Sequence, residues 1–465
     1  MEKQNDLPGL IEEDPRTPVI NREELHGKVT LWLVISTVVV SIGAVVPLGY
    51  NLGVTTVAAP FILEFLNVTN QELWNGNAPD LAITWIYSCT VTIYAVGGAL
   101  GATIGGRFCD ALGRKYSLVV SAILLPLAGL LMGICQIAGI YGLLFLGRFV
   151  AGLYAGISLG IIPVYLAEIS PINLRGAVGV FAVFMTVVGQ LLSHVIGFWG
   201  FYDQKSWPIL LSLVGFMGMI LIVVFPFCPE SPRWLFLKQK RYRDAEIALQ
   251  RLRGKTADIS TEIEEMKLEA LRDESNSTDG RVGAMDIIRL KNPEWKNPIL
   301  ICLILTVGYH FSGISALFFY TTEIFKSAGL NQEEIALATV GYSSINLIAT
   351  VIGVLLVDKV GRRPLLLYPF MAGLVLLVGM TVTINTQEEL GGYTFLIYFA
   401  CLLAVTIVMY RYLPETKNKT FAEITANFVK SPKHKRKRLE EDLEAETYVN
   451  GGAVKETNIT EETKT

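Results

Sequence analysis

The chain has 465 residues, of which 52% are hydrophobic and only 17% are charged, and its formal net charge is −3. Soluble domains usually carry about 25% charged residues. Most of the charged side chains lie in residues 1–28, 229–296 and 414–465, so the segments between them are almost uncharged. This pattern excludes a water-exposed globular protein and indicates a polytopic membrane protein. The small net charge gives no sign of nucleic-acid binding.

Ten apolar stretches are long enough to cross about 30 Å of hydrocarbon. We expect helices, because the stretches far exceed a barrel strand and because a helix satisfies its own backbone in lipid. The predicted spans are 29–50, 81–106, 115–138, 141–167, 176–200, 207–228, 297–322, 335–357, 364–385 and 392–413.

Positive charge predicts the orientation, since Lys and Arg concentrate on the cytoplasmic side. Neither residue occurs between Lys28 and Arg107, whereas 229–296 and 433–438 are rich in both. Both termini are therefore expected in the cytoplasm, and the segment after the first span is expected outside. Asn67 opens an N-x-T sequon in that segment and is a predicted N-glycosylation site.

Two motifs are repeated along the chain. The pattern D-x-x-G-R-[KR] occurs at 110–115 and at 358–363, and P-E-[ST] occurs at 229–231 and at 414–416. The motifs begin 119 residues apart in the first half but only 56 residues apart in the second. The difference is close to the length of two spans with their loops. We therefore predict two parallel copies, with six spans in the first and four in the second.

These and further motifs follow one another in a fixed order between residues 29 and 424. They are Gly49-Tyr50-Asn51, Gly106-Arg107, Gly147-Arg148-Phe149, P-V-Y-L-A-E-I-S-P at 163–171, P-E-S-P-R-W at 229–234, G-R-R at 361–363 and P-E-T at 414–416. In residues and spacing the chain closely resembles the sugar-porter branch of the major facilitator superfamily, specifically the facilitative glucose transporters of animals. The resemblance implies an all-α membrane protein with a six-helix N-terminal bundle and, here, a truncated four-helix C-terminal bundle.

The resemblance and the spans together predict five parts. These are a cytoplasmic tail (1–28), the N-terminal bundle (29–228), a cytoplasmic loop with short helices (229–296), the truncated bundle (297–413) and a second cytoplasmic tail (414–465). Within the loop, 242–253 and 258–274 are expected to form amphipathic helices, which in the family latch the two halves together. The family's tenth and eleventh spans have no counterpart between Gln387 and Pro414, so the chain is a splice form, a gene-model error or a diverged gene.

Sugar recognition needs amide and hydroxyl groups that hydrogen-bond to the ligand. The resemblance implies such contacts for Asn346, Ser312 and Gly313, while Tyr309, His310 and Ser315 stand where the family has other polar residues. Val183 stands where the family has a contacting Gln. Helical periodicity places Thr186, Gln190 and His194 on the face of Val183. Gln190 is thus a candidate replacement for the lost amide, and the alternative is a polar residue packed between helices.

Charged residues near the span ends match a cytoplasmic salt-bridge network that the family uses as a gate. They are Arg107, Arg114, Lys115, Arg148, Glu168, Arg175, Glu230, Arg233, Asp358, Arg362 and Arg363. The second-half partners of the last three are missing, so that half of the gate is expected to be weak. A purely structural anchor is the alternative role.

The resemblance implies facilitative transport of a monosaccharide such as glucose or fructose rather than an enzymatic activity. Asn51 stands where proton-coupled relatives carry an Asp, which favours uniport because Asn cannot titrate. No cofactor, metal or nucleic acid is implied. The expected partners are a sugar and membrane lipid, and the expected location is the plasma membrane. One alternative is a non-transporting form that is degraded or that associates with full-length family members. Another is a carrier of a different small organic solute.

Overall fold

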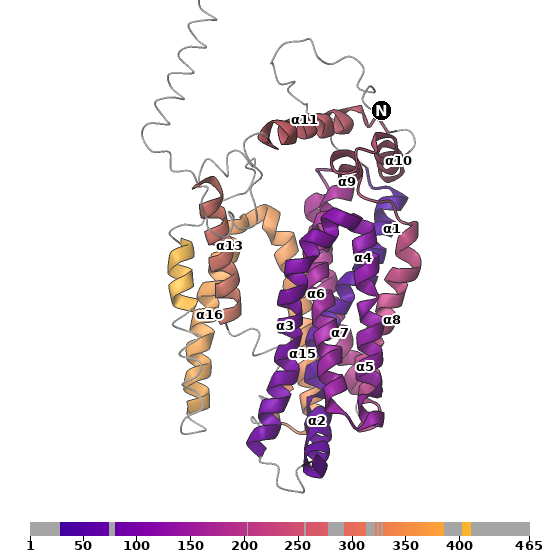
Figure 1. Cartoon of the computed structure of the whole chain (residues 1–465). Helices are drawn as coiled ribbons and strands as arrows, with labels where there is room; N and C mark the ends of the chain where they lie inside the picture. The colour runs from indigo at the N-terminus through magenta and orange to yellow at the C-terminus, as the bar shows by residue number, and fades with distance from the viewer. Residues whose placement is uncertain are drawn as a thin grey trace, which may run out of the picture. The chain divides into compact units, whose positions relative to one another are not determined.

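The computed structural model describes residues 28–73, 80–201, 203–254, 257–277, 293–312, 321–322, 325–326, 329–385 and 402–410. Every regular element in these ranges is helical (Figure 1). Seven helices are long and apolar enough to cross a membrane, and two shorter apolar helices cover 299–310 and 363–376. The expected all-α polytopic fold is therefore confirmed. The predicted span 392–413 lies mostly outside the described residues, of which 402–410 are helical.

The helices of the first half follow the predicted spans closely, with one exception. They are α1 (Leu31–Val40), α2 (Val46–Leu73), α3 (Asp80–Leu112), α4 (Arg114–Ala122), α5 (Leu124–Ala138), α6 (Tyr141–Ile169), α7 (Arg175–Gly200) and α8 (Trp207–Val224). The exception is the first span, which was predicted to end at residue 50. A π-helical turn (Ser41–Val45) joins α1 to α2, and the helix continues to Leu73.

The prediction stopped too early because polar residues and Pro60 interrupt the apolar run. The exposed fraction of Asn51, Thr55 and Thr56 is at most 1% for each residue. They therefore face the interior of the bundle and do not mark a loop. Pro60 lies inside α2 without ending it, as membrane helices often allow. The sequon at Asn67 consequently lies on the last turns of a helix and not in a loop.

Glycines allow α3 and α6 to pack with their backbones in contact. A Cβ on Gly97 would meet the carbonyl oxygen of Phe149, and one on Gly101 would meet that of Leu153. From the other side, a Cβ on Gly156 would meet the backbone of α3. Small residues at such interfaces permit close approach in lipid, where packing rather than water exclusion drives helix association.

Three helices that follow the first bundle pack together and onto it. They are α9 (Pro232–Leu237), α10 (Tyr242–Arg253) and α11 (Ser260–Ser277) (Figure 1). Their shared core includes Trp234, Leu249 and Met266. The hydroxyl of Thr30, at the start of α1, donates to the carbonyl of Leu252 across 2.6 Å. The two predicted amphipathic helices are thus present and are fixed to the first bundle.

The chain divides into two compact units, residues 1–280 with 316–351, and residues 281–315 with 352–465. The helix α15 (Gln332–Val360) begins in the first unit and ends in the second. The second unit also contains α13 (Pro293–Phe311) and α16 (Arg362–Asn385). Leu367 of α16 packs with Val405 and Met409, and side chains of α13 cover them. The predicted boundaries of the five parts remain a prediction.

Candidate functional site

Two residues that the sequence singled out separately as sugar contacts lie together inside the first unit. Gln190 is on α7 and Asn346 is on α15, and the Nδ2 amide of Asn346 donates to Oε1 of Gln190 across 3.4 Å. Gln190 is only 3% exposed, and its Nε2 has no hydrogen-bond partner in the described part of the chain. A buried donor without a partner costs about 1–3 kcal/mol. The pair is therefore suited to hydrogen-bonding an added hydroxyl group.

A second polar contact lies one turn away on the same two helices. The Nδ1 atom of His194 and the hydroxyl oxygen of Ser343 are 2.7 Å apart. Both side chains are almost fully buried. The hydroxyl of Ser343 also donates to the carbonyl of Thr339, one turn earlier on α15, across 3.1 Å. Helical periodicity predicted the place of His194 on this face of α7 but not the role of Ser343, because α15 has no distinct apolar periodicity.

The other predicted sugar contacts belong to the second unit or to undescribed residues. Tyr309 and His310 lie at the end of α13, with their rings in an edge-to-face arrangement 5.3 Å apart. The hydroxyl of Ser312 donates to the carbonyl of Tyr309 across 2.6 Å. Gly313 and Ser315 lie outside the described residues.

The predicted charged network has its centre where α4 begins and α6 ends. The Nε and Nη2 atoms of Arg114 donate to the two carboxylate oxygens of Glu168 across 2.8 and 2.9 Å. Asp110 stands 3.8 Å from the same guanidinium. The hydroxyl of Ser231 also donates to Glu168. Two parallel bonds of this kind hold both the distance and the orientation of the pair.

Glu230 joins the two repeated motifs of the first half. Its Oε1 accepts the backbone N–H of Lys115 at 2.9 Å and that of Ser231 at 2.8 Å. A carboxylate at the start of α4 is favourable because the N-terminal N–H groups of a helix carry partial positive charge. Gly113 has φ of +88°, and a Cβ there would collide with Glu230 and Trp234. Burial raises the pKa of Glu230 above its ordinary value.

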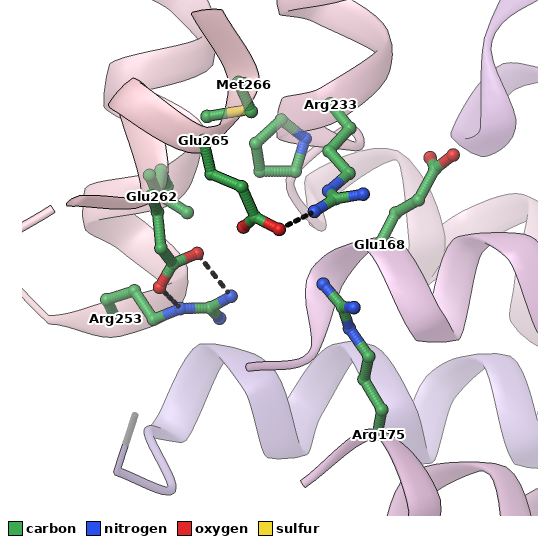
Figure 2. Close-up of a pocket in the computed structure, with 9 residues that line it drawn as sticks. Glu168, Arg175, Arg233, Arg253, Glu262, Glu265 and Met266 are labelled. Carbon is green, nitrogen blue, oxygen red and sulfur yellow. Dashed lines mark hydrogen bonds and ion pairs between the residues drawn. The ribbon is translucent and has the colours of Figure 1, made fainter. Parts of the chain in front are cut away.

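Arginine and glutamate side chains line a pocket beside this centre (Figure 2). Arg233 pairs with Glu265 at 3.2 Å and with Glu269 at 3.3 Å. Arg253 donates to both oxygens of Glu262 across 2.7 and 3.0 Å. Its Nη1 also donates to the carbonyl of Ile169 across 2.8 Å. Arg253 therefore fastens α10 and α11 to the end of α6.

Arg175 points into the same pocket in Figure 2. Its Nε donates to the carbonyl of Ser170 across 3.3 Å. Within the described ranges no carboxylate lies at ion-pair distance from it. The sequence analysis named Arg175 and Arg233 but missed Arg253 and Glu262, whose one signal was their place on the predicted amphipathic helices.

Arg148 does not lie in this cluster, contrary to the expectation. It precedes Glu168 by twenty residues on α6, which corresponds to roughly 30 Å along the helix. Its guanidinium is fully buried, lies 4.7 Å from the ring centre of Tyr94 and donates to the backbone carbonyl of Asn51 across 3.3 Å. The motif was assigned to the gate because of its charge, but Arg148 lies in the buried interior near the start of α6, at the opposite end of the helix from Glu168.

The remaining predicted gate residues are placed as follows. Lys115 donates through Nζ to the carbonyls of Pro226 and Cys228 across 3.0 and 3.1 Å. Arg107 is exposed near the end of α3. Arg363 donates to the carbonyl of Tyr410 across 2.6 Å in the second unit. The side chains of Asp358 and Arg362 lie outside the described set.

The family model described as sugar (and other) transporter matches residues 36–389 and 375–428. The chain belongs to the sugar transporter family. Human solute carrier family 2, facilitated glucose transporter member 3, is 35% identical over 379 residues, which covers 81% of this chain and 75% of that protein. The horse member 5 is 28% identical over 477 residues, with coverage of 88% and 94%.

Solved structures agree with the major facilitator fold. The proton:xylose symporter XylE bound to 6-bromo-6-deoxy-D-glucose superposes with a TM-score of 0.71 at 19% identity, and the match covers 85% of this chain and 99% of that chain. The inward-open conformation of the E. coli xylose transporter XylE gives a TM-score of 0.64 at 20% identity, with the same coverage of both chains. At this level of identity the likeness supports the fold alone.

The comparisons also bear on the missing spans. The alignment with the horse protein is longer than the whole chain of 465 residues although it covers only 88% of it. Such an alignment must include positions of the relative that have no counterpart here. The two matches of the family model meet at residues 375–389, close to the point at which the sequence analysis placed the two missing spans.

Membership of this family supports transport of a sugar, and the relatives named above are transporters rather than enzymes. Together with the apolar helices, it supports an integral membrane protein.

Proposed function

We propose that the chain is a uniporter of a monosaccharide such as glucose or fructose and that it works by alternating access. The observation that supports this most directly is the Gln190–Asn346 amide pair, which presents an unpartnered donor inside the bundle. Carboxamides can both donate to and accept from sugar hydroxyls. The remaining members of the proposed site are Ser312, Gly313, Ser315, Tyr309 and His310.

Asn51 supports the proposal of uniport rather than proton coupling. This side chain is buried on α2, and its Nδ2 donates to the carbonyl of Pro47 across 2.9 Å. An amide has no proton to release near neutral pH. A protonophore that collapses the proton gradient should therefore leave uptake unchanged, whereas a decrease in uptake would exclude uniport.

The charged cluster is proposed to act as the cytoplasmic gate. Several ion pairs that form and break together bias a two-state equilibrium more than one pair does. Its proposed members are Arg107, Arg114, Lys115, Glu168, Arg175, Glu230, Arg233, Asp358, Arg362 and Arg363. Arg148 is proposed instead to act within the bundle, beside Asn51.

The test is uptake of labelled glucose and fructose in transporter-deficient cells that express this chain, normalised to its surface level. Uptake above background that is lost in Asn346→Ala and in Gln190→Ala supports the proposal. Ser344→Ala is the matched control, because Ser344 lies on the same helix and its hydroxyl donates only to Val340 within α15 among the described residues. Uptake that survives both amide substitutions would contradict the proposed site.

The missing spans favour a second candidate, a non-transporting membrane protein. Without two helices the second bundle lacks part of the cavity wall that the family uses. A version with two family-type spans restored separates the candidates, since uptake by the restored version alone would assign the 465-residue form to the non-transporting class. Surface expression of both without hexose uptake would favour another small organic solute, which a competition panel would identify.

Placement in the cell is proposed to be the plasma membrane, in contact with lipid and with both termini in the cytoplasm. Epitope tags at each terminus should be reached by antibody only after permeabilisation.

A mobility shift on glycosidase treatment that is absent in Asn67→Gln would support glycosylation of Asn67. Association with full-length family members would be detected by co-purification.

A further inference from the structure

Four side chains form a polar ladder between α7 and α15. Gln190 contacts Asn346, and His194 contacts Ser343, one helical turn further along on each helix. The residue number rises on α7 as it falls on α15, so the two helices run antiparallel at this point. Contacts one turn apart on the same faces fix how far one helix can slide or rotate against the other.

The two contacts differ in strength. The His194–Ser343 distance of 2.7 Å is that of a short hydrogen bond between two nearly fully buried groups. The Gln190–Asn346 distance of 3.4 Å is at the limit of a hydrogen bond, and Nε2 of Gln190 is left without a partner among the described residues. The first contact is therefore built to persist, and the second can be replaced by a ligand at little cost.

Hydrogen-bond accounting limits the His194–Ser343 contact to two forms. A hydroxyl group has a single proton. Either Ser343 donates that proton to the carbonyl of Thr339 and accepts from Nδ1 of His194, or Ser343 donates to Nδ1 itself. In both forms residue 194 needs a hydrogen-bonding atom at the position of Nδ1, and the carboxamide of an Asn offers one at the same distance from the backbone.

A third helix encloses the imidazole. A Cβ on Gly53 of α2 would lie 3.1 Å from Cε1 of His194 and would collide with the hydroxyl of Ser193. The ring therefore packs closely against residue 53, where a side chain would crowd it. With Ser343 on one side and Gly53 on the other, His194 is held in one orientation.

We propose that His194 and Ser343 are positioning residues for sugar binding, which set the spacing at which the carboxamides of Gln190 and Asn346 receive a ligand. This inference rests on the proposed function. Neither side chain needs to touch the ligand, since the hydrogen bond acts by holding α7 against α15. Loss of the bond should therefore weaken binding, seen as a higher KM, more than it lowers the maximal rate.

The experiment measures KM and maximal rate for labelled glucose in cells, normalised to surface level, for His194→Ala, Ser343→Ala and the double variant. Loss of one buried hydrogen bond predicts about a fivefold increase in KM for each single variant. The double variant should show little further increase, because both changes remove the same contact. Ser343→Thr and His194→Asn keep the hydroxyl and a hydrogen-bonding atom and should restore most of the affinity. Ser344→Ala is the matched control and should leave KM unchanged.

The outcomes separate the two proposals. Uptake by the unsubstituted chain with KM changed less than twofold in both single variants overturns the positioning role and leaves the proposed function standing. A fall in maximal rate at constant KM, or additive effects in the double variant, also overturns it. Absence of glucose uptake by the unsubstituted chain at the cell surface overturns glucose transport itself, and the positioning role with it.

Discussion

Glu168 at the end of α6 holds Arg114 at the start of α4 through two hydrogen bonds of 2.8 and 2.9 Å. Both side chains are mostly shielded, with 11% of Arg114 and 16% of Glu168 exposed. Removing one partner of a shielded pair leaves the other charge without compensation, and that loss exceeds the net gain from the pair itself. The contact therefore constrains which substitutions this end of the bundle tolerates.

Glu168→Ala should lower the stability of the purified protein by about 1–3 kcal/mol, because Arg114 and Ser231 both lose their acceptor. The measurement is thermal unfolding in detergent. Asp244→Ala is the control, since Asp244 forms an exposed ion pair with Arg241 at 2.6 Å, and exposed pairs contribute about 0–1 kcal/mol. Equal effects of the two substitutions would contradict a special role for the Arg114–Glu168 pair.

Arg253→Ala should release α10 and α11 from the bundle. Arg253 joins Glu262 of α11 to the carbonyl of Ile169 at the end of α6. Limited proteolysis should then cut residues 238–277 faster, while the membrane helices stay intact. Arg243→Ala changes an exposed residue of the same helix and should leave the cleavage rate unchanged. Unchanged cleavage in Arg253→Ala would show that the core around Trp234 is enough to hold these helices.

The fold was largely predictable because apolar length is a strong signal. Four of the first six spans were placed within a few residues, and α3 runs on by six residues beyond its predicted end. The first span was cut short because Asn51 and Pro60 look like the end of a helix when burial is unknown. Only the packing of α2 against α7 and α8 shows that Asn51 faces the interior.

The site was predictable in part, and the reason lies in periodicity. The period of a helix was enough to bring Gln190 and His194 to one face, but it could not name Ser343 as a partner on a helix about 150 residues away. The same holds for Arg253 and Glu262, whose contact depends on the fold of the loop. Arg148 was misplaced because a motif gives the identity of a charge and not its depth.

The carboxyl group of Glu230 should make the free energy of unfolding fall as pH rises. Burial raises the pKa of this carboxyl in the folded state above its ordinary value. Between those two values the unfolded chain has released the proton while the folded chain retains it, so stability decreases with rising pH. Glu230→Gln keeps an oxygen for the N–H groups of Lys115 and Ser231 and should remove this slope.

The comparison for Glu230 uses melting temperatures across a series of buffers from the ordinary carboxyl pKa toward neutrality. The difference between Glu230→Gln and the unsubstituted chain should grow in favour of the variant as pH rises. Glu246→Gln, at an exposed position of α10, controls for the loss of one negative charge. A constant difference between Glu230→Gln and the unsubstituted chain would mean that the two backbone hydrogen bonds fully offset the burial.

Asn51→Asp should stabilise the protein, because it adds a negative charge to the residue whose backbone carbonyl accepts a hydrogen bond from the buried guanidinium of Arg148. The guanidinium of Arg148 is fully buried, and its Nε and Nη2 have no hydrogen-bond partner in the described part of the chain. Burial of an unpaired charge is costly, and a partner at hydrogen-bond distance offsets much of that cost. We expect a higher melting temperature for Asn51→Asp and no gain for Asn51→Leu, which removes the amide without adding charge. A lower melting temperature in both variants would mean that the ring of Tyr94 and the carbonyl of Asn51 already compensate Arg148.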